Sequence, residues 1–266
     1  MYKEVQSMFD NDIWTKVTRT SLLRQYDQEL KSGKDIKRKQ LLMIWTFKRK
    51  RHPDGSLSKY KARLCVHGGQ EQHGIHFWDT FAPVVSWMSV RTLLVLSKIH
   101  NLHTKSIDFV QAYPQADIKV TIYLHTPQGV SFGDKHQDVV LQLKKNLYGL
   151  KDAGLTWWGM ISKGLLDLGF EQTETDQCVF NKENVIILIY VDDCIINSRT
   201  KEGLDETMAA IKENFTITDE GEIEEYLGIQ IDHEPGFLRM SQSNLINRII
   251  EAIPGMNKAN PKSIPM

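Results

Sequence analysis

The chain has 266 residues, 41% hydrophobic and 25% charged with a net charge of zero, a composition typical of a globular protein with one or two domains. No apolar run approaches the roughly 20 residues that span a membrane, and the N-terminus lacks the basic and apolar regions of a signal peptide. The three cysteines lack C-x-x-C spacing, which argues against a disulfide framework or a zinc site, and we expect an intracellular protein with no membrane partner.

The first predicted element is a basic hairpin. Apolar-containing runs at 41–47 and 60–66 flank a His52-Pro53-Asp54-Gly55 turn, which is typical of paired strands. Residues 31–63 hold twelve Lys and Arg against two Asp, whereas residues 201–234 hold eleven Asp and Glu against two Lys. Phosphates respond to a local patch rather than to the total charge, so the basic segment could bind a polyanion. Two well-solvated faces would give the same pattern.

Helices and strands alternate irregularly along the rest of the chain. Apolar spacing predicts helices over 89–100, 157–168, about 203–214 and 244–253. A short strand is expected to end near Asp108, before Pro114, and a second hairpin is expected around Pro235-Gly236. Several hairpins among unevenly spaced helices favour an α+β fold with a mainly antiparallel sheet.

The segment VIILIYVDDCIIN, residues 185–197, places two adjacent carboxylates between apolar strands. The strands are expected at 185–190 and 194–196, and a tight turn between them would let Asp192 and Asp193 reach one side of a sheet. If the strand ending near Asp108 is a neighbour, three carboxylates converge. Two such charges roughly 4 Å apart repel by about 4 kcal/mol near a protein surface, and a divalent cation with oxygen ligands, Mg²⁺ or Mn²⁺, would remove that cost. A solvated turn is the alternative.

The motifs together resemble the reverse transcriptase domain of Ty1/copia-type retrotransposon Pol polyproteins. The matching segments include KYKARLCVHGGQ, FAPVVSW, SIDFVQAY, IYLHTPQGV, LYGLKDAGLTWW, IYVDDCII and YLGIQI, in the family's order between about residues 14 and 265. YVDD alone is only moderately specific, whereas the ordered set is highly specific.

The resemblance implies a right-hand polymerase fold, α+β, whose palm has an antiparallel sheet packed on helices. Fingers are expected at 1–83 and 116–148, the palm at 84–115 and 149–235, and the start of a thumb at 236–266. The implied activity is RNA-directed DNA synthesis on an RNA template and a DNA primer, with dNTPs and two Mg²⁺ ions, or Mn²⁺. The family also implies RNase H and integrase segments, which we expect to be missing from this chain, and a cytoplasmic virus-like particle.

The resemblance also implies roles for particular residues. The catalytic and metal-binding residues would be Asp108, Asp192 and Asp193. The dNTP-binding residues would be Lys48, Arg63, Tyr113, Gly149 and Lys151. The template and primer contacts would be Lys50, Tyr190, Tyr226, Leu227 and Gly228. An aromatic ring at Tyr113 would clash with a 2′-hydroxyl and so favour deoxynucleotides, and a planar guanidinium at Arg63 suits phosphate oxygens.

The chain departs from the family pattern YGLKQAPRAW at Asp152, Gly154 and Leu155, which stand for Gln, Pro and Arg. A catalytically decayed or domesticated nucleic-acid-binding relic is therefore an alternative, although it would be expected to have lost the carboxylates. Another palm-type phosphotransferase would lack KARL and YGLK. A zinc site built from the histidines between His67 and His103 has no H-E-x-x-H pattern to support it.

Overall fold

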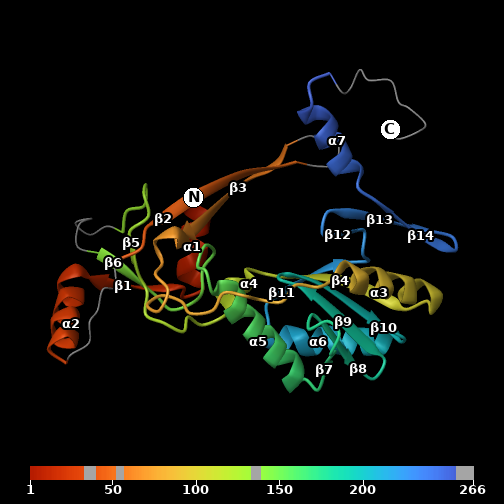
Figure 1. The fold of residues 1–266 in the computed structure, drawn as a ribbon, viewed down its shortest axis with the longest axis horizontal. Coiled ribbons are helices and arrows are strands. Elements are labelled where there is room, and N and C mark those ends of the chain that lie inside the picture. The colour runs from red at the N-terminus through yellow and green to blue at the C-terminus, as the bar shows by residue number, and fades with distance from the viewer. Residues whose placement is uncertain (33–39, 52–56, 133–138, 256–266) are drawn as a thin grey trace.

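The computed structural model describes residues 1–32, 40–51, 57–132 and 139–255, which form seven α-helices, one 3₁₀ helix and fourteen strands (Figure 1). The helices are α1 Tyr2–Asp10, α2 Arg19–Lys31, α3 Trp87–Ile99, α4 Ala112–Gln115, α5 Ala153–Asp167, α6 Lys201–Asn214 and α7 Ser243–Ala252, with the 3₁₀ helix at Gly68–Gln70. Every ladder between these strands is antiparallel, and the expected α+β class with antiparallel sheets is confirmed.

A six-stranded sheet forms the larger half of the molecule. Its strands, in spatial order, are β11 Ile217–Gly221, β4 His103–Phe109, β10 Asp193–Ser198, β9 Val185–Tyr190, β8 Val179–Lys182 and β7 Glu171–Gln172. Helices α5 and α6 pack on one face of this sheet, and α3 packs on the other. The central strands therefore have apolar side chains on both faces, which explains the nearly continuous apolar run before Asp192.

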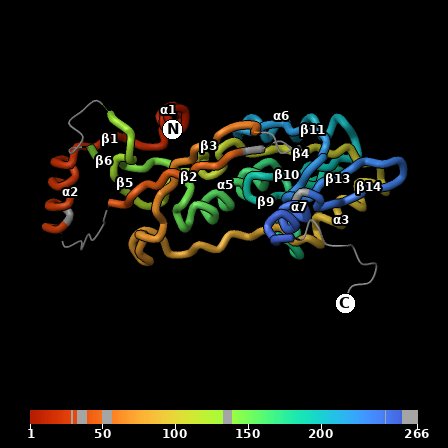
Figure 2. The backbone as a smooth tube through the Cα atoms, turned by 90° about the horizontal axis from the view of Figure 1, so that it is seen from above, coloured from red at the N-terminus to blue at the C-terminus, as the bar shows by residue number. Residues whose placement is uncertain are grey.

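A second sheet with its own core forms the other half. It consists of β1 Trp14–Thr18, β6 Val139–Leu143 and β5 Tyr123–His125. The hairpin of β2 Met43–Arg51 and β3 Leu57–Val66 shares this core and extends from it as a long ribbon (Figures 1 and 2). The expected basic hairpin is confirmed by this pairing, while its turn, 52–55, lies outside the described residues.

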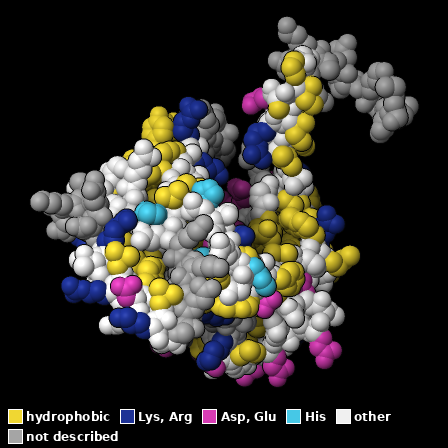
Figure 3. All heavy atoms as spheres, turned by 60° about the vertical axis from the view of Figure 1, so that its left-hand side comes forward, with side chains coloured by type: hydrophobic (Ala, Val, Ile, Leu, Met, Phe, Trp, Pro, Cys, Tyr) yellow, Lys and Arg dark blue, Asp and Glu magenta, His cyan; other side chains and the backbone are white. Residues whose placement is uncertain are grey.

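The third sheet leads to an exposed terminal helix. It contains β12 Glu225–Tyr226, β13 Ile229–Glu234 and β14 Phe237–Ser241, and the expected hairpin at Pro235-Gly236 is confirmed by the pairing of Glu234 with Phe237. Helix α7 follows and stands away from the body, with apolar side chains along its exposed length (Figure 3).

The local sequence patterns located the later helices within a few residues but missed several early elements. Helices were expected at 89–100, 157–168, 203–214 and 244–253, and the structure has them at α3, α5, α6 and α7. No expectation covered α1, α2 or the strands β1, β5 and β6. Helix α5 begins four residues earlier than predicted, directly after Asp152.

Two glycines of α5 provide a matched test of how tightly the helix packs. A Cβ at Gly164 would lie 2.5 Å from Cζ of Phe215, a buried ring in the aromatic cluster with Phe109 and Trp157, whereas a Cβ at Gly159 would meet nothing within 4 Å. We predict that Gly159→Ala raises the free energy of unfolding by up to ~1 kcal/mol through helix propensity, and that Gly164→Ala lowers it by about 1–2 kcal/mol through overpacking. Urea denaturation of both variants checks this, and a stabilised Gly164→Ala would contradict the packing described here.

Candidate active site

A two-residue turn joins β9 to β10 and carries the first carboxylate. Tyr190 pairs with Asp193, so Val191 and Asp192 form the turn itself. Val191 has a φ of +58°, an unfavourable value for a β-branched residue. Two hydrogen bonds hold the turn: Trp157 Nε1 donates to the carbonyl of Val191 at 2.7 Å, and the amide of Phe109 donates to the carbonyl of Asp192 at 2.9 Å. The buried Trp157 thus fixes the backbone that presents Asp192.

The second and third carboxylates lie opposite each other on neighbouring strands. Strand β10 pairs with β4 so that Asp193 faces Asp108 in register, and directly opposed residues project from the same face of a sheet. The two strands are neighbours, which was the condition for the three carboxylates to converge. Burial and, to a smaller extent, the negative charges of Asp192, Asp108, Glu220 and Glu225 together raise the pKa of Asp193 to about 6. The strongest electrostatic influences on Asp193 are therefore all carboxylates.

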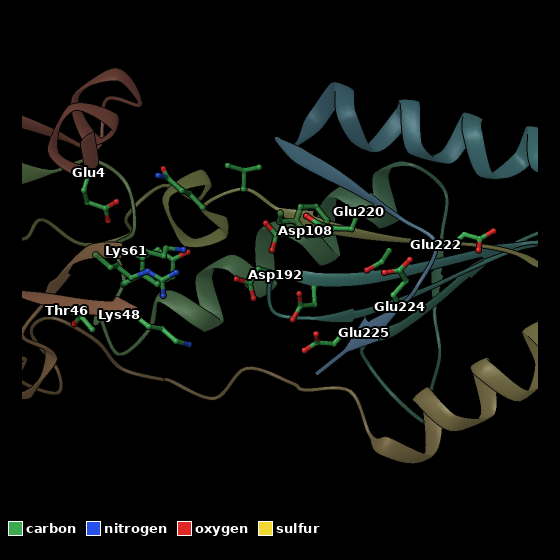
Figure 4. A pocket seen from close by; sticks show the side chains of 17 residues that line it. Glu4, Thr46, Lys48, Lys61, Asp108, Asp192, Glu220, Glu222, Glu224 and Glu225 are labelled. Carbon is green, nitrogen blue, oxygen red and sulfur yellow. The ribbon is translucent and has the colours of Figure 1, made fainter. Parts of the chain in front are cut away.

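These carboxylates form one wall of a cleft of about 1030 Å³ between the two halves of the molecule (Figure 4). Lys48 and Lys61 of the β2–β3 ribbon lie on the facing wall, and Arg63 of the same ribbon also lines the cleft. The acidic wall also includes four residues between the end of β11 and the start of β12, namely Glu220, Glu222, Glu224 and Glu225. Glu4 also lines the cleft beside the ribbon, where its Oε1 accepts a hydrogen bond from the amide of Leu64 at 3.2 Å. The other charges divide into a cationic side and an anionic side, an arrangement that suits a ligand combining phosphates with a metal cation.

An aromatic residue supports the cationic wall. The guanidinium of Arg63 lies over the ring of Tyr148, with Cζ 4.0 Å from the ring centroid. The ring of Tyr113 packs against Tyr148 with centroids 5.0 Å apart. Tyr148 lines the cleft, while Tyr113 is half-buried and is not among the described residues that line it. Burial raises the pKa of Tyr148 to about 12, so its hydroxyl is protonated at neutral pH.

Gly149 and Lys151 lie beside the cleft in packed positions. Gly149 has a φ of +96°, and a Cβ there would overlap the carbonyl oxygen of Val66, so only glycine allows this approach to β3. The ammonium of Lys151 lies 4.6 Å from the ring centroid of Phe77, and its amide donates to Glu71 Oε2 at 2.9 Å. Burial raises the pKa of Glu71 to about 7. Neither Gly149 nor Lys151 is among the described residues that line the cleft.

The residues expected to contact template and primer are spread over three elements. Lys50 lies on β2, and its side chain is outside the described part. Tyr190 ends β9 beside the carboxylates. Tyr226 is only 3% exposed and packs in the core beneath α3, while Leu227 and Gly228 form the tight turn into β13 with positive φ angles. A contact from this last segment would therefore come from its backbone rather than from the tyrosine ring.

The donor chemistry of the acidic wall fits a hard divalent cation. Asp108, Asp192 and Asp193 supply only oxygen ligands, and the neighbouring carboxylates raise the pKa of Asp193. Among the described residues, no group of three or more His, Cys, Asp or Glu side chains lies close enough, as placed, to form a complete metal site. The structure thus places Asp108, Asp192 and Asp193 in one cleft. Their carboxylates would have to move closer together to bind an ion.

Two features of the cleft were not predicted from the sequence. The acidic segment was recognised only as a charge cluster, and nothing local indicated that Glu220, Glu222, Glu224 and Glu225 would lie beside the catalytic candidates. Tyr148 was part of the YGLK motif, yet roles were assigned only to Gly149 and Lys151. The sequence pattern of β3 gives no information about the aromatic partner of Arg63, because that partner, Tyr148, lies in a loop distant in the sequence.

Comparison with known proteins agrees with this geometry. The family described as reverse transcriptase (RNA-dependent DNA polymerase) matches residues 30–266. The chain is 34% identical over 246 residues to the retrovirus-related Pol polyprotein from transposon TNT 1-94 of Nicotiana tabacum, covering 90% of this chain and 18% of the relative. It is 32% identical over 227 residues to that from transposon RE1 of Arabidopsis thaliana, covering 84% and 15%. It is 30% identical over 276 residues to the transposon Ty1-ER2 Gag-Pol polyprotein of Saccharomyces cerevisiae, covering 98% and 14%.

The fold and these matches define a domain of the RNA-dependent DNA polymerase class. The chain belongs to the reverse transcriptase family of Ty1/copia-type retrotransposon Pol polyproteins, as the sequence motifs indicated. It spans less than a fifth of the length of these curated relatives. Within the described residues, none of the helices is both long and apolar enough to cross a membrane.

The raised pKa of Asp193 predicts a pH-dependent cost in the metal-free protein. The folded state holds the proton more tightly than the unfolded chain, so this contribution to stability is present below about pH 4 and is lost as the pH rises through about 6. Asp193→Asn should therefore raise the free energy of unfolding by about 1–2 kcal/mol at pH 8, allowing for partial solvent screening, and by little at pH 4.

Urea denaturation in a chelating buffer at several pH values measures this difference. An effect of Asp193→Asn that does not change between pH 4 and pH 8 would contradict the electrostatic origin.

Proposed function

We propose that the chain extends a DNA primer with dNTPs on an RNA template. The observation that supports this most strongly is the register between β4 and β10, which sets Asp108 opposite Asp193 beside the turn that carries Asp192. The same cleft holds Lys48 and Arg63 on its facing wall. Membership of the reverse transcriptase family suggests the polymerase reaction. The cleft has basic residues that could bind the triphosphate and carboxylates that could bind the metal ions.

The parts of the fold are proposed to correspond to a right-hand polymerase. Residues 84–115 and 149–235 would be the palm, because they contain the six-stranded sheet and all three carboxylates. Residues 1–83 and 116–148 would be the fingers, since they contain the basic ribbon and the smaller sheet on which it rests. Residues 236–266 would begin a thumb, of which the structure describes β14 and α7.

In the proposed reaction, the 3′-hydroxyl of the primer attacks the α-phosphate of the dNTP, and pyrophosphate leaves. Asp108, Asp192 and Asp193 would hold the two Mg²⁺ ions, which when bound lower the cost of charge on the attacking and leaving oxygens. Arg63 and Lys48 would bind the triphosphate from the opposite wall. Tyr113 would limit the space near the sugar through its contact with Tyr148, in keeping with a preference for deoxynucleotides.

The proposed partners are an RNA template, a DNA primer, dNTPs and other segments of the Pol polyprotein. The basic ribbon would contact nucleic acid mainly through phosphates, so binding should weaken as salt increases. Lys50, Tyr190 and the turn at Leu227-Gly228 remain proposed contacts to template and primer. A cytoplasmic location in a virus-like particle is proposed from the family alone.

A nucleic-acid-binding relic without catalysis is the second candidate, because the helix after Tyr148 departs from the family pattern. The structure accommodates these departures: the carbonyl of Asp152 accepts a hydrogen bond from the amide of Thr156 at 2.9 Å and starts α5. The space at Gly154 is open enough that a Cβ would make only ordinary contacts. All three carboxylates are retained, which favours the polymerase over the relic.

The turn carboxylate provides the direct test of function. We predict that Asp192→Asn reduces Mg²⁺-dependent primer extension on poly(rA)/oligo(dT) to background, because it removes a proposed metal ligand while keeping the size of the side chain. The matched control is Asp167→Asn, an exposed carboxylate on α5 that pairs with Lys163, and it should extend primers as the unmodified chain does. Unchanged extension by Asp192→Asn would contradict the mechanism, and primer binding without extension by the unmodified chain would favour the relic.

A further inference from the structure

Arg63 lines the cleft with its guanidinium stacked on an aromatic ring. Its guanidinium lies 4.0 Å from the ring centroid of Tyr148, and both residues line the cleft with Asp108 and Asp192. Within the described part of the chain, no acidic side chain forms a salt bridge with Arg63. A stacked guanidinium keeps its edge available for hydrogen bonds, so the contact with Tyr148 orients Arg63 without occupying its donors.

The backbone fixes Tyr148 against the strand that carries Arg63. The carbonyl of Tyr148 accepts a hydrogen bond from the amide of Val66 at 2.8 Å, and Gly149 packs on the carbonyl of the same residue. Val66 follows Arg63 by three positions on β3, so the ring and the guanidinium are anchored to one strand end. The ring of Tyr113 also contacts the Tyr148 ring, with centroids 5.0 Å apart. The ring therefore has little freedom to leave Arg63.

We propose that Tyr148 is a positioning residue that holds the Arg63 guanidinium in the cleft to bind the triphosphate of the incoming nucleotide. The proposal rests on the proposed polymerase function and adds to it a determinant of nucleotide affinity. Tyr148 acts through Arg63, and the stacking requires the ring rather than the hydroxyl. Because Tyr148 supports binding rather than the chemical step, its loss should raise the KM for dNTP and leave kcat nearly unchanged.

A purely structural role for Tyr148 makes a different prediction. The ring also packs on Tyr113, so its removal could loosen the junction between the halves of the molecule. In that case kcat and KM would change together, and the loss would be the same whether or not Arg63 is present. A double-mutant cycle at Arg63 and Tyr148 distinguishes the two explanations. If Tyr148 acts through Arg63, the effects of the two substitutions on nucleotide binding are not additive.

The experiment measures nucleotide binding without turnover. A non-incorporable α,β-imido analogue of dTTP is equilibrated by dialysis, with Mg²⁺, against the full chain bound to poly(rA)/oligo(dT). The chains compared are the unmodified protein, Tyr148→Phe, Tyr148→Leu, Arg63→Ala and the Arg63→Ala/Tyr148→Leu double variant. Steady-state extension of the same set gives kcat and the KM for dTTP, and far-UV circular dichroism confirms that each variant is folded.

We expect Tyr148→Leu to weaken binding by roughly 5- to 30-fold, as for loss of a cation–π contact, and Tyr148→Phe to change it by less than about twofold. In the Arg63→Ala background, Tyr148→Leu should add less than about twofold. Equal losses of analogue affinity in Tyr148→Phe and Tyr148→Leu, additive losses in the double variant, or a loss confined to kcat would overturn the proposal.

If the set of variants shows this binding pattern but the unmodified chain extends no primer, the proposed function fails and the positioning role stands. If it extends primers but the pattern is absent, only the positioning role fails.

Discussion

The antiparallel pairing of β4 with β10 is the constraint on which the site depends. It sets Asp193 opposite Asp108, and it sets Cys194 opposite Ile107 in the core beneath the sheet. Because side chains alternate between the two faces, a slip of one residue would turn the Asp193 carboxylate towards the face covered by α5 and α6. Burial of apolar residues on both faces of β10 makes that slip costly. The hydrophobic core thus determines the register, and the register brings the carboxylates together.

Two features of the site lower the free energy of unfolding of the protein alone. Asp193 is partly buried among other carboxylates, and Val191 holds a backbone conformation that its side chain disfavours. The hydrogen bond from Trp157 and the aromatic cluster around it supply the support for this strained turn. Across the cleft, the basic ribbon offers the opposite charge. Because the two walls carry opposite charges, a ligand with phosphates and a cation would satisfy both.

The sequence located the parts of the site whose signals are local. Apolar runs around Asp192 predicted β9 and β10, and the motif SIDFVQAY predicted the strand that carries Asp108. Helix α2 was not predicted because it has few apolar residues with helical spacing. The smaller sheet was not predicted because its strand β5 has only three residues. The acidic segment before β12 and the stacking of Tyr148 on Arg63 are contacts between distant segments. Contacts between distant segments leave no periodic pattern in the sequence, so only the folded structure shows that these residues belong to the site.

The central claim is that this register creates a divalent-cation site from Asp108, Asp192 and Asp193. Titration of the purified chain with Mn²⁺, followed by electron paramagnetic resonance of the free ion, tests it most directly, because it needs neither template nor catalysis. The account predicts binding that Asp108→Asn weakens by at least about tenfold and that the surface variant Asp167→Asn leaves unchanged. Equal Mn²⁺ binding by the unmodified chain and Asp108→Asn would contradict it.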